Sequence, residues 1–96
     1  MASLHLITRS SFQSTLPQNV FLRAGKGDAF LFMNDGVYCC LSHSSITAHF
    51  MNHKCFALQA DITARAIKQL AEDISVIDYD AFVSLTLEYD RVATWY

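Results

Sequence analysis

Short apolar runs separated by turn-forming residues recur along the chain. The run Ala29–Met33 carries no charge and lies between Gly27 and Gly36. Such a run predicts a strand that is buried on both faces, and strands of this kind belong to parallel sheets covered by helices. The segment from Asn34 to Gly36 then marks the carboxyl end of a central strand. In open α/β sheets, ligands and chemistry usually sit at this end.

Four further segments are predicted as strands. They are Leu4–Thr8, Phe56–Leu58 with Lys54 and Cys55 before it, Ile74–Ile77, and Val92–Trp95 as an edge strand. The run Ile74–Ile77 is rich in β-branched side chains, which favour strands.

Helical patterns fill the intervals between these strands. Pro17 suits a first helical position, which predicts a broken first helix that ends at Gly25. Its inward residues are Val20, Phe21 and Ala24. Val37–Leu41 predicts one or two helical turns before a polar loop.

Two more helices are predicted in the second half of the chain. Asp61 stands where a helix N-cap should, and Asp78 or Asp80 does the same for the last helix. The predicted inward residues are Ile62, Ala66, Ile67 and Leu70 in the first of these helices and Ala81, Phe82, Leu85 and Leu87 in the second.

The alternation of strands and helices predicts an α/β fold. Parallel neighbouring strands require crossover connections, so four or five parallel strands with helices on both faces are expected. A chain of 96 residues fits one domain, which we assign to residues 1–96.

Composition points to a protein that has partners. Apolar residues make up 52% of the chain, which is rich for so small a domain and suggests that a partner covers part of the apolar surface. The formal charge is −2 and the basic residues are scattered, which argues against direct nucleic-acid binding.

The cell compartment is predicted from the N-terminus and the cysteines. His5, Thr8 and Arg9 interrupt the first apolar residues, unlike the core of a signal peptide, and no run is long enough to span a membrane. A cytoplasmic protein is expected, in which the three cysteines are reduced rather than paired.

Cys39 and Cys40 follow the carboxyl end of the central strand directly. A thiol near a helix N-terminus has its thiolate stabilised and is suited to carry or attack a persulfide. Free cysteines more often pack as small buried residues, so both interpretations stay open.

A metal site is weakly indicated. The candidate ligands are Cys40, His43, His49, His53 and Cys55. They lack the paired short spacing of structural zinc sites, so no metal is predicted.

Three charged residues have candidate roles near the same strand end. Asp35 suits either a turn and helix cap or a general base. Asp61 and Arg65 have the spacing of a helical ion pair, with a partner contact as the alternative. No phosphate-binding glycine loop precedes a helix, so no cofactor is predicted.

Several aromatic and apolar residues near the C-terminus are difficult to place inside so small a core. The residues concerned are Val83, Tyr89, Trp95 and Tyr96. They either close the back of the sheet or anchor an interface.

Several segments, taken in order, resemble the TusB family, the DsrH-like branch of the DsrE/DsrF/DsrH group. The matching segments are Asp28–Val37, Lys54–Leu58, Asp61–Arg65, Ile77–Tyr79, Phe82 and Val83, Leu85 and Thr86, and Trp95. The resemblance runs from about Leu4 to Trp95, nearly the whole chain.

The resemblance implies a three-layer, flavodoxin-like α/β/α fold and a role in sulfur relay. Proteins of this family assemble with TusC and TusD into a dimer of heterotrimers. That complex takes persulfide sulfur from TusA and passes it through TusE toward 2-thiouridine at the tRNA wobble position. The established sulfur-carrying cysteine of the complex lies on TusD. This chain has no cysteine before Cys39, which argues against a catalytic role and against the sulfur-oxidation branch.

The expected function is that of a non-catalytic subunit of such a complex, not of an enzyme by itself. Its interface candidates are Asp35, Asp61, Arg65, Trp95 and Tyr96. Two alternatives remain: a sulfurtransferase that carries persulfide on Cys39 or Cys40, and a metal-binding or regulatory domain. Whether the isolated chain forms homo-oligomers is left open.

Overall fold

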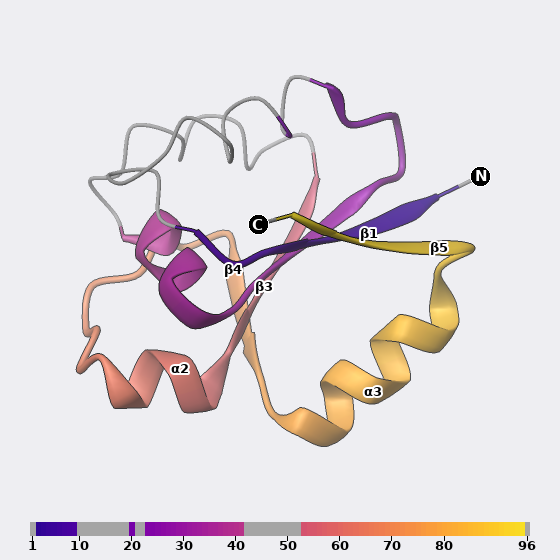
Figure 1. Ribbon diagram of the computed structural model, residues 1–96. Helices are drawn as coiled ribbons and strands as arrows, with labels where there is room; N and C mark the ends of the chain where they lie inside the picture. The colour runs from indigo at the N-terminus through magenta and orange to yellow at the C-terminus, as the bar shows by residue number, and fades with distance from the viewer. Residues whose placement is uncertain (1, 10–19, 21–22, 42–52, 96) are drawn as a thin grey trace.

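Five parallel strands form one sheet in the computed structural model, which describes residues 2–9, 20, 23–41 and 53–95. The strands are β1 (Ser3–Ile7), β2 (Ala29–Phe32), β3 (Lys54–Leu58), β4 (Ile74–Ile77) and β5 (Arg91–Trp95), in the spatial order β4-β3-β2-β1-β5 (Figure 1). The predicted α/β class and the five predicted strands are confirmed. Most of the predicted first helix, the loop with His43 and His49, and Tyr96 lie outside the described residues.

Strand β2 is central and fully buried. Successive side chains of a strand point to opposite faces, so Phe30 and Phe32 enter one apolar cluster while Ala29 and Leu31 enter another. Both faces are therefore dry at this strand. An uninterrupted apolar run is the expected sequence for such a position.

The order of the strands explains how the helices are distributed. From β1 to β4 the chain steps in one direction, and the helix α3 (Tyr79–Glu88) then returns it to β5 on the far side of β1. Right-handed crossovers in opposite directions place their helices on opposite faces. Leu85 of α3 packs with Leu4 and Leu31, whereas Ile62 packs with Phe30 in the other cluster. Figure 1 shows α3 alone in the lower right, between β4 and β5.

The helix after β3 differs from its prediction. Asp61 is not its N-cap, because α2 (Gln59–Ala64) begins directly after the strand with Leu58 as N-cap. The helix also ends earlier than predicted, since Ala66 has a φ of 51° in the left-handed region. Ile67 and Leu70 nevertheless pack against the core from the following loop. Their apolar spacing reflected burial rather than a continuing helix.

A 3-10 helix, η1 (Asn34–Cys40), follows β2. The helical turns predicted from Val37 are thus present but begin three residues earlier. Gly36 lies so close to β1 that a Cβ at this position would overlap the carbonyl oxygen of Ile7. Glycine is required here by the close approach of two backbones.

The N-cap of the last helix is Asp78, the first of its two predicted caps. The Oδ1 of Asp78 accepts a hydrogen bond of 2.9 Å from the backbone N–H of Ala81 and so caps α3. The predicted inward face was partly wrong, because Leu87 is 82% exposed. Ala81 is exposed as well. The predicted Leu85 and Phe82 do face the sheet, with Tyr89 packed beside them at helical spacing.

Candidate functional site

Asp35, Asp61 and Arg65 meet at the carboxyl edge of the sheet. The Nη2 of Arg65 lies 3.0 Å from Oδ1 of Asp35 on η1, and its Nη1 lies 3.5 Å from Oδ1 of Asp61 on α2. The predicted ion pair between Asp61 and Arg65 is confirmed. Asp35 joins it from 30 residues away in the sequence. We call these three residues the edge cluster.

The edge cluster fastens the end of β2 to α2. The second carboxylate oxygen of Asp61 accepts a 2.8 Å hydrogen bond from the backbone N–H of Asn34. Asn34 itself has a φ of 51°, a conformation that asparagine tolerates better than most residues. The side chain of Asp35 is 48% exposed, against 22% for Arg65. With both carboxylates bound to one guanidinium, the cluster forms a fixed polar patch.

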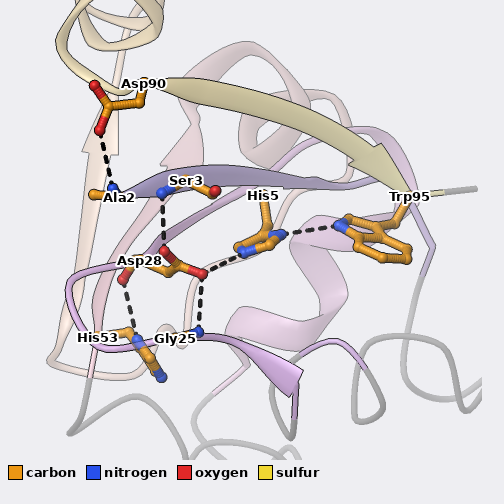
Figure 2. Close-up of polar contacts among 8 residues, drawn as sticks. All are labelled: Ala2, Ser3, His5, Gly25, Asp28, His53, Asp90 and Trp95. Atoms are coloured by element: carbon orange, nitrogen blue, oxygen red, sulfur yellow. Dashed lines mark hydrogen bonds and ion pairs between the residues drawn. The ribbon is translucent and has the colours of Figure 1, made fainter.

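A second polar network lies inside the sheet (Figure 2). The carboxylate of Asp28 accepts hydrogen bonds from the backbone N–H groups of Ser3 and Gly25, at 2.8 and 2.9 Å. Its Oδ2 also lies 2.9 Å from Nε2 of His5, and both side chains are about nine-tenths buried. The Nδ1 of His5 faces Nε1 of Trp95 at 3.0 Å.

These contacts fix the tautomer of His5. The indole N–H of Trp95 can only donate, so Nδ1 of His5 accepts and its Nε2 carries the hydrogen donated to Asp28. Burial raises the pKa of Asp28, but the hydrogen bonds from His5, Ser3 and Gly25 outweigh that effect and leave the pKa below the ordinary carboxyl value. The network is a satisfied structural element that ties β1, β2 and β5 together.

Sequence reasoning did not find this network. The signal available was a histidine inside an otherwise apolar strand, because a buried imidazole requires partners. Nothing in the sequence identified Asp28 and Trp95 as those partners, since they lie 23 and 90 residues away.

Trp95 is engaged within the chain. Besides its bond to His5, its backbone oxygen accepts a 2.8 Å hydrogen bond from the hydroxyl of Thr8. The ring packs against the core from the end of β5 and remains partly exposed. The structure therefore gives Trp95 a structural role in the sheet beside its predicted place at an interface.

The three cysteines are all buried. Cys39 and Cys40 lie in the last turn of η1, so neither has the position near a helix N-terminus on which the reactive interpretation depends. Burial raises the pKa of the Cys40 thiol, and the neighbouring Cys39 and Cys55 add to the effect. Burial, with the charge of Asp73, raises the pKa of Cys55 to about 12. These surroundings disfavour the thiolate that persulfide chemistry needs.

Potential metal ligands do not gather in the described part of the chain. Among those residues, no group of three or more His, Cys, Asp or Glu side chains is placed to hold a metal ion. The Nδ1 of His53 instead lies 3.0 Å from the backbone oxygen of Asp28. Within the same residues, no helix has the length and apolar character to cross a bilayer.

Comparisons with known proteins agree with this fold. The family described as DsrH like protein matches residues 9–92. Proteins named TusB from Pectobacterium parmentieri and Escherichia coli are each 30% identical, and one from Serratia proteamaculans is 34% identical. Each of these alignments covers 96% of this chain and 99% of the relative.

A solved structure shares the architecture. The crystal structure of the YchN protein from E. coli superposes with a TM-score of 0.68, covers 99% of this chain and 100% of its own, and is 15% identical in sequence. The structural similarity supports the fold, and membership of the family rests on the sequence matches. The chain belongs to the DsrH-like family and is a relative of the proteins named TusB.

Proposed function

We propose that this chain is a non-catalytic subunit of a TusBCD-like heteromeric sulfurtransferase complex in the cytoplasm. The complex relays persulfide sulfur for 2-thiouridine formation at the tRNA wobble position. The chain contributes a single DsrH/TusB-like domain over residues 1–96, in line with the family match over residues 9–92. Its direct partners are TusC-like and TusD-like subunits, and TusA and TusE act with it indirectly.

The observation that carries the non-catalytic role is the burial of every thiol. Cys39 and Cys40 have no exposed surface, and Cys55 is 2% exposed. A persulfide carrier must present its sulfur to a donor and to an acceptor, and its thiolate must form near neutral pH. Burial hides all three sulfurs, and the raised pKa values of Cys40 and Cys55 disfavour their thiolates. A structural subunit, in contrast, is well served by cysteines that fill the core.

The edge cluster supports a role in assembly. Asp35, Asp61 and Arg65 hold a polar patch in fixed geometry at the carboxyl edge, where the half-exposed Asp35 and the partly exposed Asp61 and Arg65 are accessible to another subunit. Fixed charges of both signs favour one docking orientation over others. They are interface candidates, together with Trp95 and Tyr96.

Co-expression tests the proposal. The tagged chain is produced with the TusC-like and TusD-like proteins of the same bacterium, and the recovered assembly is weighed by native mass spectrometry. We expect both partners in equal amounts with the tagged chain. Recovery of the chain alone as a stable monomer, with no affinity for either partner, would contradict the proposal.

The same preparation separates the proposal from its two alternatives. After incubation with a persulfide donor, we expect no added sulfur on peptides that contain Cys39 or Cys40. A sulfur adduct on either residue would instead support a sulfurtransferase. Stoichiometric zinc that is lost on replacing His43 and His53 would support a metal-binding domain.

A further inference from the structure

The outer side of α3 carries an exposed apolar row. Tyr79, Val83 and Leu87 follow one another at intervals of four residues, so they lie on the same side of the helix. They are 59%, 56% and 82% exposed. We call these three residues the α3 row. It is distinct from the inward face of the helix, which Leu85 occupies.

A hollow continues the α3 row at its first residue. Its volume is about 480 Å³, and it lies between α2 and the start of α3. The lining residues are Gln59, Ala60, Thr63, Ala64, Asp78 and Tyr79. Tyr79 belongs to both features, so the row and the hollow form one continuous apolar surface.

The charges on α3 and on the residues that flank it directly have one sign. Residues 78–90 contain Asp78, Asp80, Glu88 and Asp90 and no lysine or arginine. All four carboxylate residues are exposed. On a helix of 3.6 residues per turn, Asp80 and Glu88 fall on the flank of the α3 row that faces away from the inward-packed Phe82 and Tyr89. The apolar row thus lies between the buried face of α3 and an acidic border.

This charge distribution indicates which kind of partner can bind the α3 row. Pairing of the α3 row with the same row of a second copy would bring two acidic borders together without a cation from this segment. Like charges brought together at an interface oppose association. A complementary occupant offers apolar side chains for the row and basic side chains for the border.

We propose that the α3 row and its hollow are the surface on which a sister subunit docks, through an apolar segment bordered by lysine or arginine. This inference rests on the proposed function, because it assumes that the chain works in a heteromeric complex. Beyond the proposed function, it specifies the surface that binds the sister subunit and the side chains that the sister subunit presents. An amphipathic helix laid in a groove is one established form of such a contact.

Two variants test the surface, one through its apolar contact and the other through its charge. V83S/L87S removes the apolar contact. Serine has a helix propensity similar to that of valine and lower than that of leucine, so the melting curve of this variant is compared with that of the wild type. E88K reverses the acidic border, and a lysine in the last turn suits the helix dipole, so the helix is not weakened. The matched controls are Val92→Ser, an exposed apolar residue on β5, and Glu72→Lys, an exposed acidic residue after α2.

The measurement is binding of each purified variant to the co-purified pair of sister subunits by biolayer interferometry. We expect V83S/L87S and E88K each to bind about tenfold or more weakly, with both controls close to wild type. Added salt should weaken wild-type binding more than E88K binding. Circular dichroism melting curves verify that each variant is folded.

The possible failures are distinguishable. If wild-type protein does not bind the sister subunits, the proposed function itself fails. If wild type binds and both variants bind equally well, the docking surface lies elsewhere and the inference is overturned while the proposed function stands. A wild-type chain that dimerises by itself, with V83S/L87S monomeric, would assign the surface to a second copy and also overturn the inference.

Discussion

The imidazole of His5 and the carboxylate of Asp28 meet at 2.9 Å between β1 and the residue that precedes β2. The carboxylate of Asp28 also accepts hydrogen bonds from two backbone N–H groups, and Nδ1 of His5 accepts one from the indole N–H of Trp95. The centre and one edge of the sheet are therefore joined by a buried polar chain (Figure 2). Such a hydrogen-bonded network stabilises a fold only when every polar group in it is paired, so substitution of any of these residues should destabilise the protein.

Removing the carboxylate should be costly. In Asp28→Ala, the N–H groups of Ser3 and Gly25 and the Nε2 of His5 lose their acceptor. We expect the free energy of unfolding to fall by about 2–4 kcal/mol, as measured by urea denaturation. Glu72→Ala, at an exposed position, should change it by less than about 0.5 kcal/mol. Equal stability of the two variants would show that the network contributes little.

The same carboxylate should make stability depend on pH. The pKa of Asp28 is lowered in the folded protein, so its ionised form stabilises the fold above the unfolded-state pKa of about 3.9. This contribution is lost as the pH falls through the lower folded-state pKa. The stability gap between wild type and Asp28→Asn should accordingly narrow below about pH 4, as measured by urea midpoints across pH. A stability difference between wild type and Asp28→Asn that stays constant or widens in acid would contradict the lowered pKa of Asp28. Glu72→Gln serves as the control.

Trp95 should stabilise the sheet through its N–H as well as its ring. Trp95→Phe keeps an aromatic ring but removes the donor to His5, which leaves a largely buried acceptor unpaired. A loss of about 1–2 kcal/mol in the free energy of unfolding is expected, followed by far-ultraviolet circular dichroism. Tyr79→Phe, which alters an exposed ring, provides the comparison. Trp95→Phe at wild-type stability would rule out a structural role for the indole N–H.

Gly36 should not tolerate a side chain. A methyl group at this position would overlap the backbone of Ile7, which cannot rotate away. Gly36→Ala is expected to destabilise the protein by about 2 kcal/mol or more in chemical denaturation. At Gly25 the nearest atom to an added Cβ is Oδ2 of Asp28, at 3.8 Å, so Gly25→Ala should cost far less. Similar losses for the two variants would contradict the close approach seen between η1 and β1.

Local patterns in the sequence were sufficient for the strands and for the cap of α3. The run Ala29–Met33 was identifiable as a strand because a strand buried on both faces needs an uncharged run, and the structure gives β2 over Ala29–Phe32. The cap of α3 was narrowed to Asp78 or Asp80 because few residue types can satisfy the first turn of a helix, and the structure uses Asp78. The spacing of Asp61 and Arg65 likewise predicted their ion pair.

Features that depend on distant residues were beyond such patterns. The end of α2 is set by the backbone of Ala66, while Ile67 continues the apolar spacing beyond it. The exposure of Leu87 follows from the position of α3 over the sheet, which no local pattern specifies. Asp35 joined Arg65 only because the carboxyl ends of neighbouring parallel strands meet at one edge.

The central claim is that this chain serves assembly and that its thiols carry no sulfur. The most direct test replaces Cys39, Cys40 and Cys55 with alanine together and measures 2-thiouridine in tRNA from a strain whose own copy of the gene has been deleted. Co-purification with the sister subunits first verifies that the triple variant still assembles. We predict 2-thiouridine at the level restored by the wild-type chain. A variant that assembles normally but leaves the wobble uridine unthiolated would contradict the account.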